Sequence, residues 1–346
     1  MNERIKIFGK GAVQSLQAGR KKLLKAQEAR SAVAVLEKQN GPLSEAVKRR
    51  AREDATERLG AARHAAWLMV YAAVQGEYRD GWLPDSYYLE NVMPRINGTA
   101  HHLGRIRATN RVFFDHDAVP DLIYVLNGRL MGRDLVALTP VRALEILRDS
   151  GAAVVFKADE SGFGKGVKTL DTAHLDQQNI LRLGDGVIQP KIVSHPVFDM
   201  VGGDALATVR IGTVLPDTGR PQVRTCYLKL GRAGQPHVIA RDQIRVAVDW
   251  QSGVLNQNGY LSNWHRIEKC PTFGTPFGSL NVPAIQKAVD IVLDLHSRIP
   301  LARYVCWDLA IDAGENVHLL EWEGGVVSFA EAVQGPCFTD LGWDKL

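Results

Sequence analysis

WDLAIDAGENVHLLEWEGG, residues 307–325, alternates apolar and polar side chains on both sides of the turn-forming segment 313–316. This pattern is typical of two antiparallel strands joined by a tight turn. With the turn at these positions, Asp308 lies opposite Glu321 and Ala310 lies opposite Leu319. Glu323 follows on the face of the two acids, and the other face is expected to bury Trp307, Leu309, Ile311, Leu320 and Trp322.

The three acids of this hairpin indicate a site for a cation. Two carboxylates at directly opposite strand positions repel each other, and the pair destabilises a sheet unless a positive group lies between them. A divalent cation is the simplest candidate. Because Mg²⁺ is usually held by one or two carboxylates together with substrate phosphates, the hairpin also predicts a nucleotide. The alternative is a polar strand face exposed to solvent, and the hairpin alone does not decide between the two.

Length and composition are those of a globular protein. The 346 residues allow two or three domains, and 45% hydrophobic with 23% charged residues argue against disorder. The four cysteines show no C-x-x-C spacing, which argues against a zinc ribbon or a disulfide framework and favours a reducing compartment. The charged N-terminus predicts no signal peptide, and the apolar run 65–74 is shorter than the roughly 20 residues of a membrane span. We therefore expect a cytoplasmic protein without a transmembrane segment.

Positive charge is concentrated at the N-terminus. Residues 1–50 hold 12 Lys and Arg but 4 Asp and Glu, although the net charge of the whole chain is +4. Such a basic segment could contact an anionic membrane, a polyphosphate or a nucleic acid, or it could be a solvated helix face. No aromatic residues are interleaved with the charges for base stacking, so we expect no nucleic-acid partner.

Helices are expected before residue 80 and strands mainly after residue 110. Residues 13–75 are rich in helix formers and are interrupted at Asn40-Gly41-Pro42, which predicts two long helices. Further helices are predicted from Thr139 to Ser150, with Pro140 in the first turn, and from Val282 to Arg298. The predicted strands are 111–117, 122–128, 152–156, 187–193, 205–215, 223–231, 243–250 and the two strands of the hairpin. The fold class is therefore α+β with largely antiparallel strands.

A glycine-rich loop follows one of these strands in VVFKADESGFGKGVKTL, residues 154–170. Gly162, Gly164 and Gly166 could bring backbone N–H groups close to phosphate oxygens, and Lys165 adds a positive charge. The spacing is neither a Walker A motif nor a Rossmann fingerprint. A mobile surface loop without a ligand is at least as consistent with these glycines.

Lys157 strengthens the phosphate interpretation. It alternates with Val155 and Ala153 on an otherwise apolar strand, while Val154 and Phe156 occupy the other face. A lysine at such a position either extends to solvent or meets an anion. An ammonium group just before a glycine loop could hold the phosphates of a nucleotide.

Four motifs, taken in chain order, resemble the ATP-grasp superfamily: the lysine and glycine loop at 157–166, VIQPKIVSHP at 187–196, TVRIGT at 208–213 and the acidic hairpin. The chain looks most like the sugar-transfer-associated ATP-grasp group, which is linked to polysaccharide and conjugate biosynthesis. The resemblance spans about residues 80–340. It implies two α+β subdomains that clamp ATP, at 96–190 and 191–346, preceded by a helical region at 1–95.

The resemblance also implies which residues contact the nucleoside. Gln189 matches the start of the adenine hinge, and the backbone of Lys191 and Ile192 would lie next to the purine. His195 or Asp199 would lie near the ribose.

Phosphate and metal contacts are implied in the later strands. Arg210 and Lys229 match phosphate-facing basic residues, although either could be an ordinary cation on a strand face. Asp308 and Glu321 match the two metal-binding acids. Glu323 departs from the pattern, because many members carry Asn at this position. We expect it to act as a third acid at the metal, where it could tighten metal binding or weaken the hold on the acyl-phosphate.

The implied activity is that of an ATP-dependent carboxylate–amine or carboxylate–nucleophile ligase with ATP and Mg²⁺ as cofactors. A substrate carboxylate would attack the γ-phosphorus of ATP, and an amine or other nucleophile would then displace phosphate from the acyl-phosphate. The alternatives are a small-molecule kinase on the same scaffold and a non-catalytic ATP-binding partner of a glycosyltransferase system. Basic residues such as Arg232, Arg241 and Arg245 could receive a substrate carboxylate or lie at the surface. The oligomeric state, including a homodimer, stays open.

Overall fold

The computed structural model of the chain describes residues 24–161, 166–203, 205–231 and 242–346. They form two compact units. The first contains the described residues up to Arg95 together with Asn263–His265 and Val326–Leu346, and the second contains Ile96–Ser262 and Arg266–Gly325. No sequence pattern indicated that the C-terminal segment returns to the helical unit. The domain boundaries at residues 95 and 190 stay predictions.

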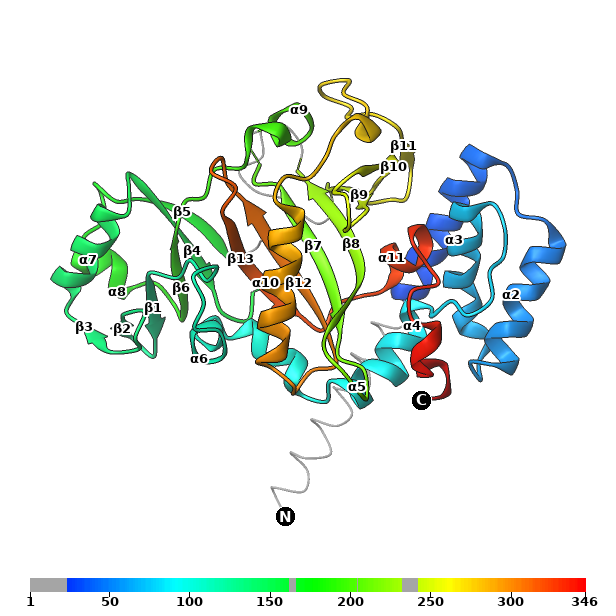
Figure 1. The fold of residues 1–346 in the computed structure, drawn as a ribbon, viewed down its shortest axis with the longest axis horizontal. Helices are drawn as coiled ribbons and strands as arrows, with labels where there is room; N and C mark the ends of the chain where they lie inside the picture. Colours follow the sequence, from blue (N-terminus) through cyan, green and yellow to red (C-terminus); the bar gives the residue numbers. More distant parts are fainter. Residues whose placement is uncertain (1–23, 162–165, 204, 232–241) are drawn as a thin grey trace, which may run out of the picture. The chain divides into compact units, whose positions relative to one another are not determined.

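Helices build most of the first unit (Figure 1). The chain is helical over residues 24–40, and the further helices are α2 (Glu45–Glu57), α3 (Ala65–Gln75), α4 (Asp85–Tyr87) and α11 (Ser328–Val333). The prediction of two long helices was wrong, because the part after Gly41 is divided into α2 and α3. Gly60, with a φ of +75°, turns the chain between them, a conformation that glycine adopts at little cost.

Aromatic side chains from three chain segments form the core of the first unit. Trp67 of α3 packs against Trp264, with ring centroids 5.9 Å apart, and Trp264 packs against Phe329 of α11 at 6.1 Å. All three side chains are buried. The helical unit therefore depends on residues that lie far from it in the sequence.

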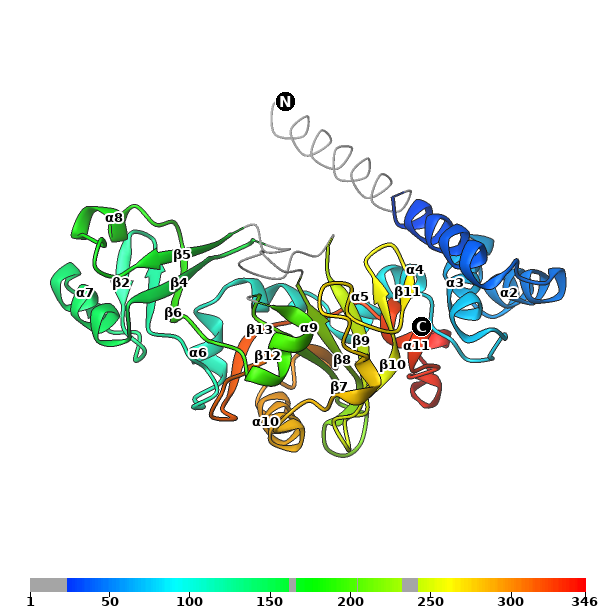
Figure 2. The ribbon, with the colours of Figure 1, turned by 90° about the horizontal axis from the view of Figure 1, so that it is seen from above.

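A six-stranded antiparallel sheet occupies part of the second unit, with the strand order β3-β2-β1-β6-β4-β5. The strands are β1 (Ile123–Leu126), β2 (Arg129–Met131), β3 (Ala137–Leu138), β4 (Ala153–Ala158), β5 (Val167–Asp171) and β6 (Gly186–Pro190). Helices α7 (Pro140–Asp149) and α8 (Gln177–Leu181) pack on one face of this sheet (Figure 2). The predicted helix start is confirmed, since the side chain of Thr139 accepts a hydrogen bond from the Arg142 amide before α7.

A seven-stranded antiparallel sheet forms the rest of the second unit, with the order β11-β10-β9-β8-β7-β12-β13. Its strands are β7 (Thr208–Val214), β8 (Gln222–Leu230), β9 (Ile244–Val248), β10 (Leu255–Leu261), β11 (Arg266–Ile267), β12 (Tyr304–Ile311) and β13 (Val317–Glu323). Three shorter helices lie outside the strands: α5 (Met93–Ile96) and α6 (Thr109–Phe113) precede β1 in the chain, and α9 (Asp199–Gly202) lies between β6 and β7.

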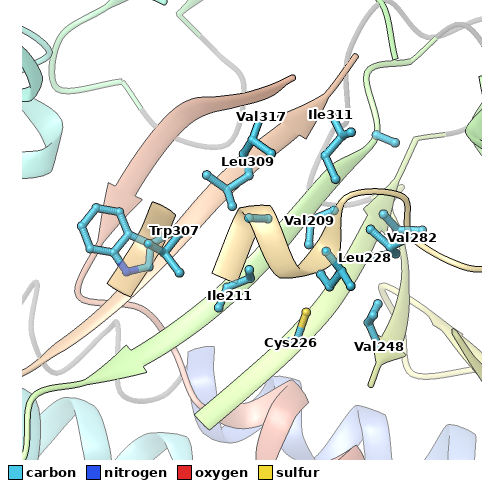
Figure 3. Packing of buried hydrophobic residues seen from close by; sticks show 14 of the residues in the cluster. Val209, Ile211, Cys226, Leu228, Val248, Val282, Trp307, Leu309, Ile311 and Val317 are labelled. Carbon is cyan, nitrogen blue, oxygen red and sulfur yellow. The ribbon is translucent and has the colours of Figure 1, made fainter. Parts of the chain in front are cut away.

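Helix α10 (Ile285–Ser297) lies across one face of β7, β8 and β12 (Figures 1 and 3). The side chains that point to the helix are apolar and buried, among them Val209, Ile211, Leu228, Trp307 and Leu309 (Figure 3). Because neighbouring residues of a strand point to opposite faces, the residues between them lie on the other face of the sheet.

The register of the β12–β13 hairpin is confirmed at the acids and wrong near the turn. Asp308 lies opposite Glu321, but Leu309 lies opposite Leu319, so that Ala310 faces His318 and not Leu319. The shift between Asp308 and Leu309 is a β-bulge, which inserts one unpaired residue into β13. As a consequence Leu319 joins the core where Leu320 was expected.

One predicted strand was also wrong. Residues 111–117 form the end of α6 and an irregular segment, and Phe114 is fully buried with its ring 5.5 Å from that of Trp307. Burial of the aromatic ring outweighs the strand propensity of this segment. Over the described residues, no helix combines the length and the hydropathy that a membrane span requires.

Candidate functional site

The face of the seven-stranded sheet that α10 does not cover carries several of the predicted residues, and we call it the site face. Direct cross-strand pairs place Glu321, Asp308, Arg210 and Tyr227 in one row across β13, β12, β7 and β8. Lys229 belongs to the neighbouring row. The strand alternation that buries the core residues thus brings the acids and bases together on the opposite face.

Asp308 is the centre of this arrangement. It is 2% exposed, and Arg210 donates to both of its oxygens, from Nε at 2.6 Å and from Nη2 at 2.7 Å. Lys229 Nζ donates to Oδ2 as well. Burial by itself would raise the pKa of Asp308, but the two cations outweigh burial and hold the pKa below its ordinary value. Asp308 is therefore a carboxylate fixed between two basic side chains.

The other two acids also meet arginines. Glu323 Oε1 lies 2.7 Å from Nη1 of Arg210. Glu321 Oε2 lies 3.4 Å from both Nη1 and Nη2 of Arg107. Burial and the neighbouring charge of Asp308 raise the pKa of Glu321. The repulsion inferred from the sequence is thus present, and side-chain cations offset it in this structure.

The carboxylate oxygens of this site fit a magnesium ion that is bound together with phosphates. Over the described parts of the chain, no three or more His, Cys, Asp and Glu side chains form a group that could hold a metal by themselves. Asp308 and Glu321 nevertheless offer oxygen ligands from directly opposite strand positions, and the 3.4 Å contacts leave Glu321 weakly held. Mg²⁺ commonly takes only one or two carboxylates and completes its shell with water and substrate phosphates. The metal roles of Asp308, Glu321 and Glu323 stay predictions.

Lys157 of β4 reaches the hairpin from the six-stranded sheet. Its Nζ donates to the backbone oxygen of Leu320 at 3.3 Å, one residue from Glu321. Burial and the charge of Arg107 lower the pKa of Lys157 to about 8, against the smaller effects of the surrounding acids. As predicted from the alternation, Val154 and Phe156 lie in the core on the other face of β4.

Gln189 of β6 lies on the face of the small sheet that carries Lys157, because Val155 pairs with Gln189 and Lys157 with Val187. It is 1% exposed and donates its Nε2 hydrogen to Asp121 Oδ1. Tyr124 donates to the other oxygen of Asp121 at 2.7 Å. This orientation leaves the side-chain oxygen of Gln189 as the acceptor, which is the group that an adenine amino group would need.

The remaining hinge residues follow β6. His195 donates its backbone N–H to Ile311 at 2.8 Å and accepts a hydrogen bond from the Val197 amide at its Nδ1. Lys191 and Asp199 are exposed, Ile192 is half-buried, and none of these three side chains bonds to another predicted site residue within the described chain. The structure therefore brings only the backbone of this segment to the hairpin tip.

Part of the glycine loop can be located. Gly162, Gly164 and Lys165 lie outside the described residues, as do Arg232 and Arg241. Gly166 closes the base of the loop, where its backbone oxygen accepts from Ala158 at 3.0 Å. A Cβ at Gly166 would lie 2.3 Å from Ser161 Oγ, so this position requires glycine for steric reasons.

Two residues at the site were missed in the sequence. Arg107 is 5% exposed, and its backbone N–H donates to Asp159 Oδ1 at 2.8 Å while its guanidinium faces Glu321. Asp121 is fully buried beside Gln189. Arg107 stands in an irregular segment without a motif. An acid directly before the apolar run 122–126 was the only signal for Asp121.

Comparison with known proteins gives one family and several distant structures. No curated protein matches the chain. Similar solved structures include a biotin carboxylase–beta-gamma-ATP complex from Campylobacter jejuni, with a TM-score of 0.45 and 10% identity. The match covers 90% of this chain and 67% of that one. A D-cycloserine synthetase, DcsG, has a TM-score of 0.40 and 14% identity, and the match covers 72% of this chain and 71% of that one. An N5-carboxyaminoimidazole synthetase from Staphylococcus aureus has a TM-score of 0.38 and 8% identity. The match covers 64% of this chain and 44% of that one, so the chain spans less than half of that protein.

The family is shown by a match to the model described as sugar-transfer associated ATP-grasp, which covers residues 120–332. The matched range contains β1 to β13 and every predicted site residue. The resemblance inferred from the motifs and the ATP-grasp fold that it implies are confirmed, and the chain belongs to the sugar-transfer associated ATP-grasp family.

Proposed function

We propose that the chain is an ATP-dependent, ADP-forming ligase that joins a small-molecule carboxylate to an amine or another nucleophile. The observation that carries the proposal is the contact of Lys157 Nζ with the Leu320 oxygen at 3.3 Å, next to the acidic pair of the hairpin. It brings a cation of the six-stranded sheet to the acids of the seven-stranded sheet. This is the arrangement that a nucleoside triphosphate and its metal ion require.

The proposed reaction has two steps. A carboxylate oxygen of the substrate attacks the γ-phosphorus of ATP, the bond from that phosphorus to the bridging oxygen breaks, and ADP leaves. The nucleophile then attacks the acyl carbon of the acyl-phosphate, inorganic phosphate leaves with the bonding electrons, and the nucleophile loses its proton to solvent. Neither step needs a nucleophilic side chain.

The residues would act mainly by position and charge. An anionic carboxylate must approach a polyanion, and Arg210 and Lys229 would neutralise the transferring phosphoryl group. Lys157 and Arg107 would hold the other phosphates. A magnesium ion held by Asp308 and Glu321, with Glu323 nearby, would supply further charge neutralisation on the phosphate oxygens.

The nucleoside would bind at the hinge and the loop would cover the phosphates. The oxygen of Gln189 and the backbone of Lys191 and Ile192 are the proposed adenine contacts, with His195 or Asp199 at the ribose. The loop residues proposed for the phosphates are Gly162, Gly164, Lys165 and Gly166.

ADP release tests the function directly. The full chain with Mg²⁺ and ATP is offered mixtures of carboxylic acids and amines, ADP is measured, and the products are identified by mass spectrometry. A condensed product together with ADP supports the ligase. A phosphorylated product without condensation selects a kinase, and ATP binding without turnover over a broad substrate screen selects a non-catalytic nucleotide-binding protein.

An arginine pair provides the matched test of the site. Arg210→Ala removes the partner of Asp308 and Glu323, and we expect ADP release to fall by about 100-fold or more, as for the loss of a charge-stabilising group. Arg220→Ala, at an exposed position between β7 and β8, should leave it unchanged. Full activity of the Arg210 variant would refute its role.

A further inference from the structure

A buried carboxylate lies behind the proposed adenine contact. Asp121 is two residues before β1, and its side chain is fully buried. Its Oδ1 accepts a hydrogen bond from Nε2 of Gln189, and its Oδ2 accepts one from the hydroxyl group of Tyr124 at 2.7 Å. Both oxygens therefore have a donor within the second unit, and the carboxyl group is held in one orientation.

This carboxylate determines which end of the Gln189 amide faces it. An ionised carboxylate only accepts hydrogen bonds, whereas an amide has an NH₂ donor at one end and an oxygen acceptor at the other. The NH₂ group of Gln189 must therefore turn toward Asp121, and Oε1 must turn away from it. The opposite orientation would place two acceptors against each other in a buried position, which is costly.

Positive groups around Asp121 stabilise its ionised form. Burial raises the pKa of Asp121, whereas the hydrogen bonds from Gln189 and Tyr124 and the charges of Lys157 and Arg107 oppose this rise. The two cations also belong to the proposed phosphate site. The same positive charge that would attract a nucleotide therefore favours the carboxylate that orients the amide.

The amide is also at a suitable distance from the proposed phosphate contacts. Lys157 pairs with Val187, two residues before Gln189 on β6, so Lys157 and Gln189 are diagonal neighbours on one face of the β4–β6 pair. Diagonal neighbours in antiparallel strands lie roughly 7–8 Å apart. A base at Gln189 and a phosphate at Lys157 can belong to one nucleotide, because only the ribose has to fit between them.

The oxygen of Gln189 remains as an acceptor for a ligand. Among the described residues, no group donates a hydrogen bond to Oε1, although Gln189 is only 1% exposed. At position 6, adenine carries an amino donor, whereas guanine carries an oxygen acceptor, as does hypoxanthine. With the amide fixed in this orientation, a 6-amino purine gains a hydrogen bond and a 6-oxo purine is repelled.

We propose that Asp121 sets the base specificity of this chain: it fixes the Gln189 amide with its oxygen toward the base and thereby selects 6-amino over 6-oxo purine nucleotides. Asp121 is a positioning residue, because it acts through Gln189. This assignment rests on the proposed function, which places adenine at Gln189.

Binding of ATP and ITP tests the assignment. ITP carries an oxygen in place of the 6-amino group and a proton at N1, and it is otherwise identical to ATP. The full chain with Mg²⁺ at pH 8, without a carboxylate substrate, is titrated calorimetrically with each nucleotide. We expect ATP to bind at least about tenfold more tightly than ITP, as for one good contact to a base edge.

Two variants isolate the part that Asp121 plays. Asp121→Asn keeps the shape but offers both a donor and an acceptor, so the Gln189 amide can turn over, and the preference for ATP should fall by about tenfold. The double variant Asp121→Asn with Gln189→Glu exchanges the carboxylate and the amide. Its glutamate presents only acceptors to the base, and the preference for ATP should return. A merely structural role of Asp121 would not produce this rescue.

Tyr124→Phe is the matched control, because it removes the other hydrogen bond of Asp121 and leaves the one from Gln189. It should keep the preference for ATP. An equal loss of the preference in this variant and in Asp121→Asn would refute the assignment.

The outcomes separate this assignment from the proposed function. If the wild-type chain binds ATP and ITP equally tightly, the role of Asp121 in base selection is refuted and the proposed function stands. If the wild-type chain binds neither nucleotide, the proposed function fails, and this assignment fails with it.

Discussion

The charge of Lys157 depends on what it meets at the hairpin. Burial and the neighbouring Arg107 lower its pKa to about 8, so that close to half of the side chains are neutral in the free protein at that pH. A folded-state pKa below the ordinary value of 10.5 means that the folded chain binds fewer protons than the unfolded chain between about pH 8 and 10.5. The contribution of Lys157 to the free energy of unfolding therefore rises with pH between about pH 8 and 10.5. Negative phosphates at the site would favour the charged form again.

Nucleotide binding at pH 8 should therefore take up roughly half a proton per site, and affinity should fall as the pH rises above 8. Calorimetric titration in two buffers with different ionisation enthalpies measures this uptake. Lys157→Met should abolish it. An uptake that is the same in wild type and in the variant would contradict the assignment of Lys157 to the phosphates.

Single residues at the site differed in how well the sequence predicted them. Lys157, Asp308 and Glu321 could be singled out because each places a charge on an otherwise apolar strand or opposite a like charge, which is visible in local sequence. Arg107 could not be, because its only unusual property is burial beside Glu321, more than 200 positions away. Burial of this kind follows from tertiary packing.

The hairpin formed by β12 and β13 is the element that fixes the acids opposite each other. Asp312 closes its turn by accepting hydrogen bonds from the backbone N–H groups of Gly314 and Asn316, both at 2.9 Å, and from His318 Nε2 at 2.8 Å. Burial of Asp312 is outweighed by these donors, which lower its pKa to about 2. The turn is therefore held by an ionised side chain.

Asp312→Ala should lower the free energy of unfolding by about 2 kcal/mol, because these three donors and the side-chain amide of Asn316 lose a charged acceptor. Asp312→Asn keeps one acceptor oxygen and should lose about half of that. Urea unfolding followed by fluorescence and circular dichroism measures both. Equal stability of the Ala variant and wild type would show that the turn does not depend on this side chain.

At the level of elements, local pattern predicted strands better than details of pairing. The alternation of Trp307, Leu309 and Ile311 is sufficient to assign β12 and its buried face, since strand periodicity is local. The bulge in β13 could not be derived, because either Leu319 or Leu320 satisfies the same pattern. The position of the bulge depends on which of the two leucines packs in the core, and in the structure this is Leu319.

At the scale of the whole molecule, Glu331 connects distant segments of the first unit. It is fully buried and accepts hydrogen bonds from the backbone N–H groups of Leu83 and Cys337, both at 2.7 Å. Burial raises the pKa of Glu331 from 4.5 to about 7, and the two donors only partly offset this. A carboxyl group with a raised folded-state pKa stabilises the fold fully below pH 4.5 and loses that contribution as the pH rises through 7.

Glu331 should therefore make the first unit less stable by roughly 3 kcal/mol at pH 8 than at pH 4.5. Glu331→Gln cannot ionise and should flatten this part of the pH profile, although its amide group replaces one acceptor and lowers stability overall. Denaturant unfolding at several pH values, compared between wild type and variant, isolates the effect. Parallel profiles would show that Glu331 does not titrate in this range.

The sequence by itself determined the β-rich second unit, the helical first unit, the faces of β4 and β12 and the opposition of Asp308 to Glu321, because each follows from the spacing of nearby residues. Only the tertiary structure decided that Arg107 and Asp121 belong to the site, that Arg210 and Lys229 meet Asp308, and that the C-terminal segment returns to the first unit. These depend on contacts between segments far apart in the chain, and no local pattern specifies such contacts.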